Sequence, residues 1–123
     1  MNDRQTFGAF LKEKRNQQVI TLRDMADMIG IGYGYYSDLE SGRRIPVLDL
    51  EFLNKIITAL KLSEDDIKKL YDLAGKAREA APPDLTGYIN TSQKARIALR
   101  IAKEKATDED WERFAEYLER KDE

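Results

Sequence analysis

The chain has 123 residues, a net charge of −2, and neither cysteine nor histidine. Without these two residue types the sequence has no disulfide framework, no thiolate or imidazole metal ligand and no imidazole general base. We therefore predict no metal, no cofactor and no catalytic residue, and we do not expect an enzyme. The length allows one small domain with a helical extension. The N-terminus is polar and the apolar runs are short, so the sequence predicts no signal peptide, no membrane span and a cytoplasmic location.

Charge is balanced along the chain, which limits what composition alone can say about partners. The first 50 residues contain seven basic and seven acidic side chains. Binding to nucleic acid needs a local basic surface more than a basic composition. The residues that can supply one are Arg23, Arg43 and Arg44.

The first predicted helix covers residues 5–17, because apolar side chains recur there at helical spacing. Phe7, Phe10 and Leu11 are expected to form its inward face.

Residues 21–46 are typical of two short helices joined by a glycine-rich corner and followed by a basic loop. The first helix, residues 22–29, can be capped by Thr21. It should end at Gly30, because glycine takes the left-handed cap conformation without steric cost. The second helix covers residues 33–41. This is the layout of a helix-turn-helix.

Two longer helices, residues 49–60 and 63–78, are predicted next. They are expected to contribute side chains to the hydrophobic core and no functional residues. Their expected inward side chains are Leu50, Leu53, Ile56, Ile57, Leu60, Ile67, Leu70, Tyr71 and Ala74.

The composition changes at residues 79–91, where two prolines end the preceding helix and begin a connection.

Two further helices are predicted, one over about 92–105 and one capped by Thr107, and together they form a helical hairpin over residues 92–121. The first has basic side chains along one side, and the second has acidic ones. The second also has an apolar stripe made of Trp111, Phe114, Ala115 and Leu118. Two interpretations remain open: a solvated hairpin, or a dimerisation element, since two such helices cannot make a full core alone.

Ten positions in the N-terminal half match a known family in residue type and spacing. They are Arg15, Ile20, Thr21, Met25, Ala26, Gly30, Leu39, Glu40, Gly42 and Pro46. On these residues the chain resembles the Cro/cI-type (XRE) helix-turn-helix family of phage and bacterial repressors, over roughly residues 7–77. The resemblance implies an all-α fold: a five-helix, lambda-repressor-like DNA-binding domain at residues 1–78, a connection at 79–91 and a C-terminal two-helix extension.

The resemblance also implies roles for individual residues. In the family, residues at the positions of Arg15 and Glu40 form a partly buried ion pair between the first and third helices; two unrelated surface charges are the alternative. Family members usually have a glutamine that contacts a phosphate at the position of Leu22. Because leucine cannot make that contact, Arg23 is expected to make it instead. The DNA contacts implied for this chain are Thr21, Arg23, Tyr33, Gly34, Tyr35, Ser37, Asp38, Arg43 and Arg44.

The three tyrosines of residues 33–41 are expected to differ in role. Tyr36 occupies a position that is buried in the family. Tyr33 and Tyr35 are expected to face outward and to contact sugar, thymine methyl or phosphate. The alternative for these two is an aromatic patch that binds a protein.

The sequence thus predicts a sequence-specific DNA-binding transcriptional regulator, of the phage- or mobile-element-type repressor class. It is expected to bind a palindromic operator in double-stranded DNA as a homodimer. The alternative is an antitoxin or adaptor that holds a protein partner, through the tyrosines or the C-terminal helices.

Overall fold

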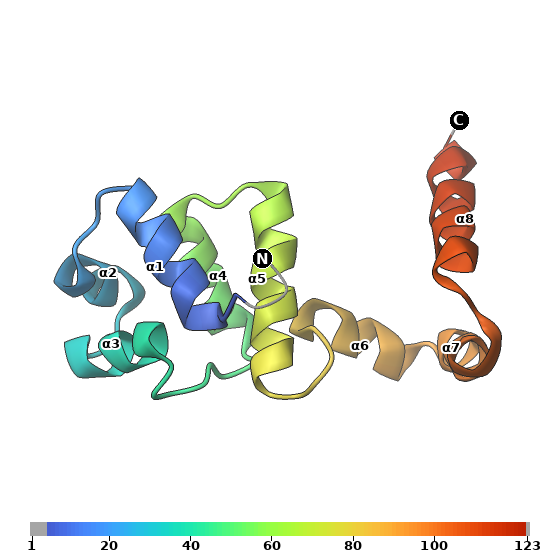
Figure 1. Ribbon diagram of the computed structural model, residues 1–123, viewed down its shortest axis with the longest axis horizontal. Helices are drawn as coiled ribbons and strands as arrows, with labels where there is room; N and C mark the ends of the chain where they lie inside the picture. The colour runs from blue at the N-terminus through green and yellow to red at the C-terminus, as the bar shows by residue number, and fades with distance from the viewer. Residues whose placement is uncertain (1–4, 123) are drawn as a thin grey trace. The chain divides into compact units, whose positions relative to one another are not determined.

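The computed structural model describes residues 5–122, and within that range it contains eight α-helices and no strand (Figure 1). The predicted all-α fold is therefore confirmed. The helices are α1 (Phe7–Gln17), α2 (Leu22–Ile29), α3 (Tyr33–Ser41), α4 (Leu50–Leu60), α5 (Glu64–Ala77), α6 (Pro83–Thr91), α7 (Gln93–Lys105) and α8 (Asp108–Glu119). A 3-10 turn, Arg120–Asp122, follows α8. No helix among the described residues is both long enough and apolar enough to cross a membrane.

Local capping interactions define the ends of the first five helices. Gly30 and Gly42 end α2 and α3 with φ angles of 74° and 86°, a conformation that glycine adopts without strain. Because Thr6 caps α1, that helix begins at Phe7 rather than at residue 5. The side chains that accept a hydrogen bond from a first-turn backbone N–H of α1, α2, α4 and α5 are those of Thr6, Thr21, Asp49 and Ser63.

Helices α1 to α5 enclose one hydrophobic core (Figure 1). Helix α1 packs against α3 and α5, and α2 packs against α3 and α4. The backbones of α1 and α3 lie close together at Gly8, where a Cβ atom would overlap the carbonyl of Leu39. The core residues are Phe7, Phe10, Leu11, Met25, Ala26, Ile29, Tyr36, Leu39, Leu53, Ile56, Ala59, Leu60, Leu70, Leu73 and Ala74.

The core differs from the prediction at one end of α4. Leu50 was expected to face inward, but it is 49% exposed. It is the first residue of α4 and precedes the fully buried face, which begins at Leu53. Ala59 and Leu73, which the apolar pattern did not single out, are buried instead. Three other predicted core residues are only partly buried: Ile57, Ile67 and Tyr71.

The chain divides into two compact units, one ending at Thr86 and the other beginning at Gly87. The division falls inside α6, so the stretch predicted as a connection is helical over most of its length. Pro83 begins this helix, because the first position of a helix needs no backbone N–H. Three α-helices therefore follow α5 in the described chain, where the sequence predicted two.

The second unit contains the two predicted C-terminal helices, but neither has a fully buried residue. Ser92 caps α7, and Thr107 forms a reciprocal capping box with Asp110 at the start of α8. Local signals therefore form each helix, while the apolar faces stay open in a single chain. The assignment of residues 92–121 as a separate hairpin domain remains a prediction.

Candidate nucleic-acid interface

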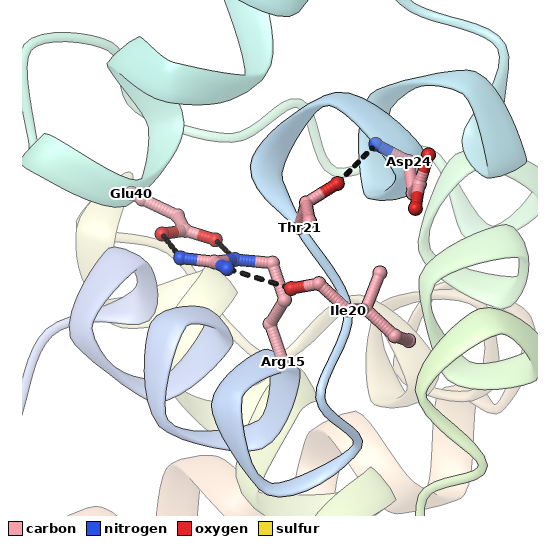
Figure 2. A network of polar contacts seen from close by, with 5 residues as sticks. All are labelled: Arg15, Ile20, Thr21, Asp24 and Glu40. Atoms are coloured by element: carbon pink, nitrogen blue, oxygen red, sulfur yellow. Dashed lines mark hydrogen bonds and ion pairs between the residues drawn. The ribbon is translucent and has the colours of Figure 1, made fainter.

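Arg15 on α1 joins three parts of the first unit (Figure 2). Its Nε and Nη2 atoms donate to the two carboxylate oxygens of Glu40 on α3, at 2.7 and 3.0 Å. Its Nη1 atom donates to the carbonyl of Ile20, just before α2, at 2.7 Å. The arginine and glutamate side chains are only 9% and 6% exposed, and the hydrogen bonding of Arg15 to the Glu40 carboxylate raises the pKa of Arg15. The predicted ion pair is confirmed, and it fixes α1, α3 and the entry to α2 together.

Tyr36 on α3 is fully buried close to this ion pair, as predicted. Burial raises the pKa of its phenol above the ordinary value. Within the described residues, the phenol oxygen has no hydrogen-bond partner. Tyr36 therefore anchors α3 through its ring and is not accessible to a ligand.

The N-terminal end of α2 is open to solvent. Thr21 Oγ1 accepts a hydrogen bond from the backbone N–H of Asp24 at 3.0 Å (Figure 2). The first-turn N–H groups form the positive end of the helix dipole, which favours an anion. Arg23 is exposed in that same turn.

Two arginines lie over two tyrosines of α3. The guanidinium of Arg23 on α2 is 5.0 Å from the centre of the Tyr33 ring. The guanidinium of Arg44, in the loop after α3, is 4.3 Å from the centre of the Tyr35 ring. Such a pair contributes about 0.5–1 kcal/mol at an exposed site. Contact with a ring limits the conformations of each arginine side chain. It does not use the N–H groups of the guanidinium as hydrogen-bond donors, so these remain available to another molecule.

Exposure along α3 separates the residues predicted to contact DNA. Tyr33 is 45% exposed, so its predicted outward orientation is confirmed. Tyr35 is only partly exposed, because its ring packs against the edge of the core. Ser37 and Asp38 are also partly exposed. The first turn of α3 is therefore its most accessible part.

Gly34, in that first turn, has no structural need to be glycine. Its φ is not in the left-handed region, and a Cβ atom there would meet nothing within 4 Å. Glycine within a helix costs about 1 kcal/mol relative to alanine. The position is thus unfavourable for the helix and open to a close approach by another molecule.

The loop after α3 is held in shape by hydrogen bonds to one carbonyl. The hydroxyl of Ser41 and the backbone N–H of Arg44 both donate to the carbonyl of Asp38, each at 3.2 Å. Arg43 Nη1 is 3.9 Å from the Asp38 carboxylate, and the Arg43 side chain is 79% exposed. So exposed a pair contributes little to stability. Asp38 nevertheless offsets part of the positive charge on this side of α3.

Arg78, at the end of α5, is a positioning residue that sequence reasoning missed. Its Nε atom donates to the carbonyl of Pro46 at 2.7 Å, across 32 positions of sequence. This bond joins the end of the loop that contains Arg43 and Arg44 to the end of α5. No local spacing reveals such a contact, because it depends on how α5 packs beside the loop.

We call the α2 N-terminus, the outer side of α3 and the following loop the recognition surface. The structure joins six of its predicted residues in three pairs: Arg23 with Tyr33, Arg44 with Tyr35, and Arg43 with Asp38. Its members are Thr21, Arg23, Tyr33, Gly34, Tyr35, Ser37, Asp38, Arg43 and Arg44.

Comparison with known proteins agrees with this geometry. Residues 8–73 match a family model described as a helix-turn-helix domain. The chain belongs to the helix-turn-helix domain family. The matched range begins in α1 and ends in α5, so it includes the core and the recognition surface. This is the type of domain that the resemblance to Cro/cI-type regulators predicted.

Two kinds of curated relative share the helix-turn-helix domain. The chain is 39% identical over 59 residues to "Transcriptional regulator ClgR" of Mycobacterium tuberculosis, in strains CDC 1551 / Oshkosh and ATCC 25618 / H37Rv. That match covers 48% of this chain and 51% of ClgR, so the chain spans about half the length of these relatives. It is also 31% identical over 68 residues to the "ImmF control region 10 kDa protein" of Bacillus phage phi105, covering 55% of this chain and 73% of the phage protein. No solved structure matches the chain significantly.

Proposed function

We propose that this chain is a transcriptional regulator that binds double-stranded DNA through the recognition surface. The observation that carries the proposal is the open first part of α3, where Arg23 of α2 lies over Tyr33, Arg44 of the following loop lies over Tyr35, and a Cβ atom at Gly34 would meet nothing within 4 Å. In helix-turn-helix proteins the N-terminal residues of the second helix contact base edges in the major groove. Arginines on either side of that helix are suited to the phosphates that border the groove.

The side chains of this surface indicate how a duplex would be read. Tyr33 and Ser37 cannot make the bidentate contacts that arginine, asparagine or glutamine make to purines. We infer that Tyr33 contacts thymine methyl groups and sugars, while Arg23, Arg43 and Arg44 bind phosphates. Gly34 would let the α3 backbone approach the base edges closely, because no Cβ stands between them.

We further propose that the protein acts as a dimeric repressor on a palindromic operator. One recognition helix spans only a few base pairs, so a two-fold protein gains specificity by binding two half-sites about 34 Å apart. A regulatory role is supported by the names of the relatives, one a transcriptional regulator and the other a phage control-region protein. Repression would follow if the bound dimer blocks access to a promoter.

Selection of bound duplexes from a random library tests the proposal. The full chain should enrich a two-fold symmetric sequence with half-sites one helical turn apart. If no duplex is retained at low salt, the proposal fails and the adaptor interpretation becomes the better one. Enrichment of an asymmetric site would contradict only the dimeric mode of binding.

Salt dependence then tests the assignment of the loop arginines. Replacing both Arg43 and Arg44 by alanine should reduce the slope of log affinity against log salt by about 2, because each lost phosphate contact removes about one unit. A matched control removes two exposed lysines from α1 and α5 instead, Lys12→Ala with Lys68→Ala. An equal change of slope in both variants would contradict the assignment.

A further inference from the structure

The carboxylate of Asp38 on α3 accepts no hydrogen bond from residues 5–122. Its side chain is 35% exposed, and its ion pair with Arg43 Nη1 spans 3.9 Å, which is beyond hydrogen-bond distance. Because the Arg43 side chain is 79% exposed, this pair is weak and Arg43 is free to turn to another anion. Ser41 and Arg44 donate to the backbone carbonyl of Asp38, so the loop after α3 does not depend on the carboxylate. The carboxylate therefore contributes little to the fold of the first unit.

Asp38 lies one helical turn after Gly34, away from the buried side of α3. Residues four apart in a helix are neighbours on one face, whereas the buried residues of α3, Tyr36 and Leu39, lie on a different side. A helical side chain covers the turn that precedes its own Cα, so we expect the Asp38 carboxylate to border the open backbone at Gly34. A Cβ atom at Gly34 would meet nothing within 4 Å. A base edge that approaches α3 at Gly34 therefore approaches the Asp38 carboxylate as well.

Asp38 is also the side chain of α3 with the strictest hydrogen-bonding requirement. No residue of α3 has an amide, guanidinium or ammonium side chain, and its two ionised residues are Asp38 and Glu40. Glu40 is already bound to Arg15. The hydroxyls of tyrosine and serine can donate or accept, whereas a carboxylate can only accept. A base that faces Asp38 must therefore supply a donor.

In the major groove a carboxylate has few suitable partners. Guanine and thymine present acceptors, so a carboxylate placed against either would face an unpaired oxygen or nitrogen. The donors are the amines of cytosine and adenine. The adenine amine lies between two acceptors, N7 of its own ring and O4 of the paired thymine. The cytosine amine has guanine O6 on one side and a carbon-bound hydrogen on the other, so cytosine repels a carboxylate least.

We propose that Asp38 selects a cytosine in each half-site by accepting a hydrogen bond from its N4 amine. On binding, Arg43 moves from Asp38 to a phosphate, so that both charged groups are satisfied. A carboxylate close to phosphates weakens binding to every sequence, and the contact with cytosine offsets this repulsion only at the correct site. The inference rests on the proposed function, since it names the base that the recognition surface selects at one position.

Duplex selection with variants of the full chain tests this assignment. The wild type should enrich a half-site with one fixed cytosine, and Asp38→Ala should lose the preference at that position while keeping the others. Asp38→Asn should shift the preference to adenine, because an asparagine amide contacts adenine N6 and N7 together. Asp72→Asn removes an exposed carboxylate from α5 instead and should keep the cytosine. Circular dichroism checks that each variant retains the helix content of the wild type.

The variant Arg43→Gln separates base selection from support of the loop. If Asp38 acted only by holding Arg43, then Arg43→Gln and Asp38→Ala would lose the same base preference. We expect Arg43→Gln to bind all sequences more weakly and still to select cytosine, because a lost phosphate contact weakens binding about uniformly.

Affinities for single duplexes give the magnitude of the effect. Changing the selected C·G pair to T·A should weaken binding of the wild type on the order of 10- to 100-fold, and that of Asp38→Ala by less than about threefold. Three results would each overturn the inference while leaving DNA binding intact: cytosine still selected by Asp38→Ala, cytosine lost in Arg43→Gln, or no fixed cytosine for the wild type. A wild type that retains no duplex would overturn the proposed function, and this inference with it.

Discussion

Replacing Glu40 by alanine should destabilise the first unit by about 3–5 kcal/mol, because it leaves a buried guanidinium charge without its counter-ion. In the native structure Arg15 makes two bonds to Glu40 and one to the carbonyl of Ile20. The variant keeps only the last of these. The loss is a large part of the 5–15 kcal/mol that typically holds a domain together. Urea unfolding at low temperature, followed by circular dichroism, measures it.

An apolar double variant separates the charge from the packing. Arg15→Met combined with Glu40→Leu fills much of the same space and buries no charge, which is often neutral or stabilising for a buried ion pair. It does leave the carbonyl of Ile20 without its donor, which costs about 1–3 kcal/mol. The double variant should therefore be more stable than Glu40→Ala alone, but less stable than the wild type.

A second ion pair in the same unit provides the control. Lys14 Nζ is 3.0 Å from the carboxylate of Asp66, but these side chains are 18% and 27% exposed. Lys14→Ala should cost about 1 kcal/mol or less, because partly solvated pairs are weak. If Glu40→Ala lowers the free energy of unfolding no more than Lys14→Ala does, then burial does not make the Arg15–Glu40 pair stronger than a partly solvated pair, and the reasoning is wrong.

Three further substitutions test single features of the first unit. Tyr36→Phe should leave stability unchanged or raise it by up to about 1 kcal/mol, since it removes a buried hydroxyl that has no partner in the described chain; a clear loss on urea unfolding would reveal a hidden hydrogen bond. Val19→Asn should stabilise by about 1 kcal/mol, because Val19 has a φ of 57° and is 89% exposed, and asparagine tolerates that conformation better; an unchanged midpoint would argue against strain. Gly34→Ala should raise stability by about 1 kcal/mol while weakening binding to the selected duplex; unchanged affinity would show that Gly34 is not close to DNA.

Local sequence signals determined seven of the eight described helices of this protein and several of their ends, whereas α6 had been predicted as a connection. The bounds of α2 and α3 agree with the prediction. Thr21 caps the start of α2, and Gly30 and Gly42 end α2 and α3, and each of these residues acts on backbone only a few positions away. The buried face of α1 followed from apolar spacing for the same reason. The pairing of Arg15 with Glu40 spans 25 positions, and the sequence indicated it only through the resemblance to a known family.

Tertiary packing decided the features that no local spacing contains. The stacking of Arg23 on Tyr33 depends on the angle between α2 and α3, and the bond from Arg78 to Pro46 depends on how α5 lies beside the loop. The exposure of Leu50 depends on where α4 leaves the core, although its spacing matches that of its buried neighbours. The open faces of α7 and α8 have a related cause, because an apolar stripe predicts that a helix is covered without showing which surface covers it.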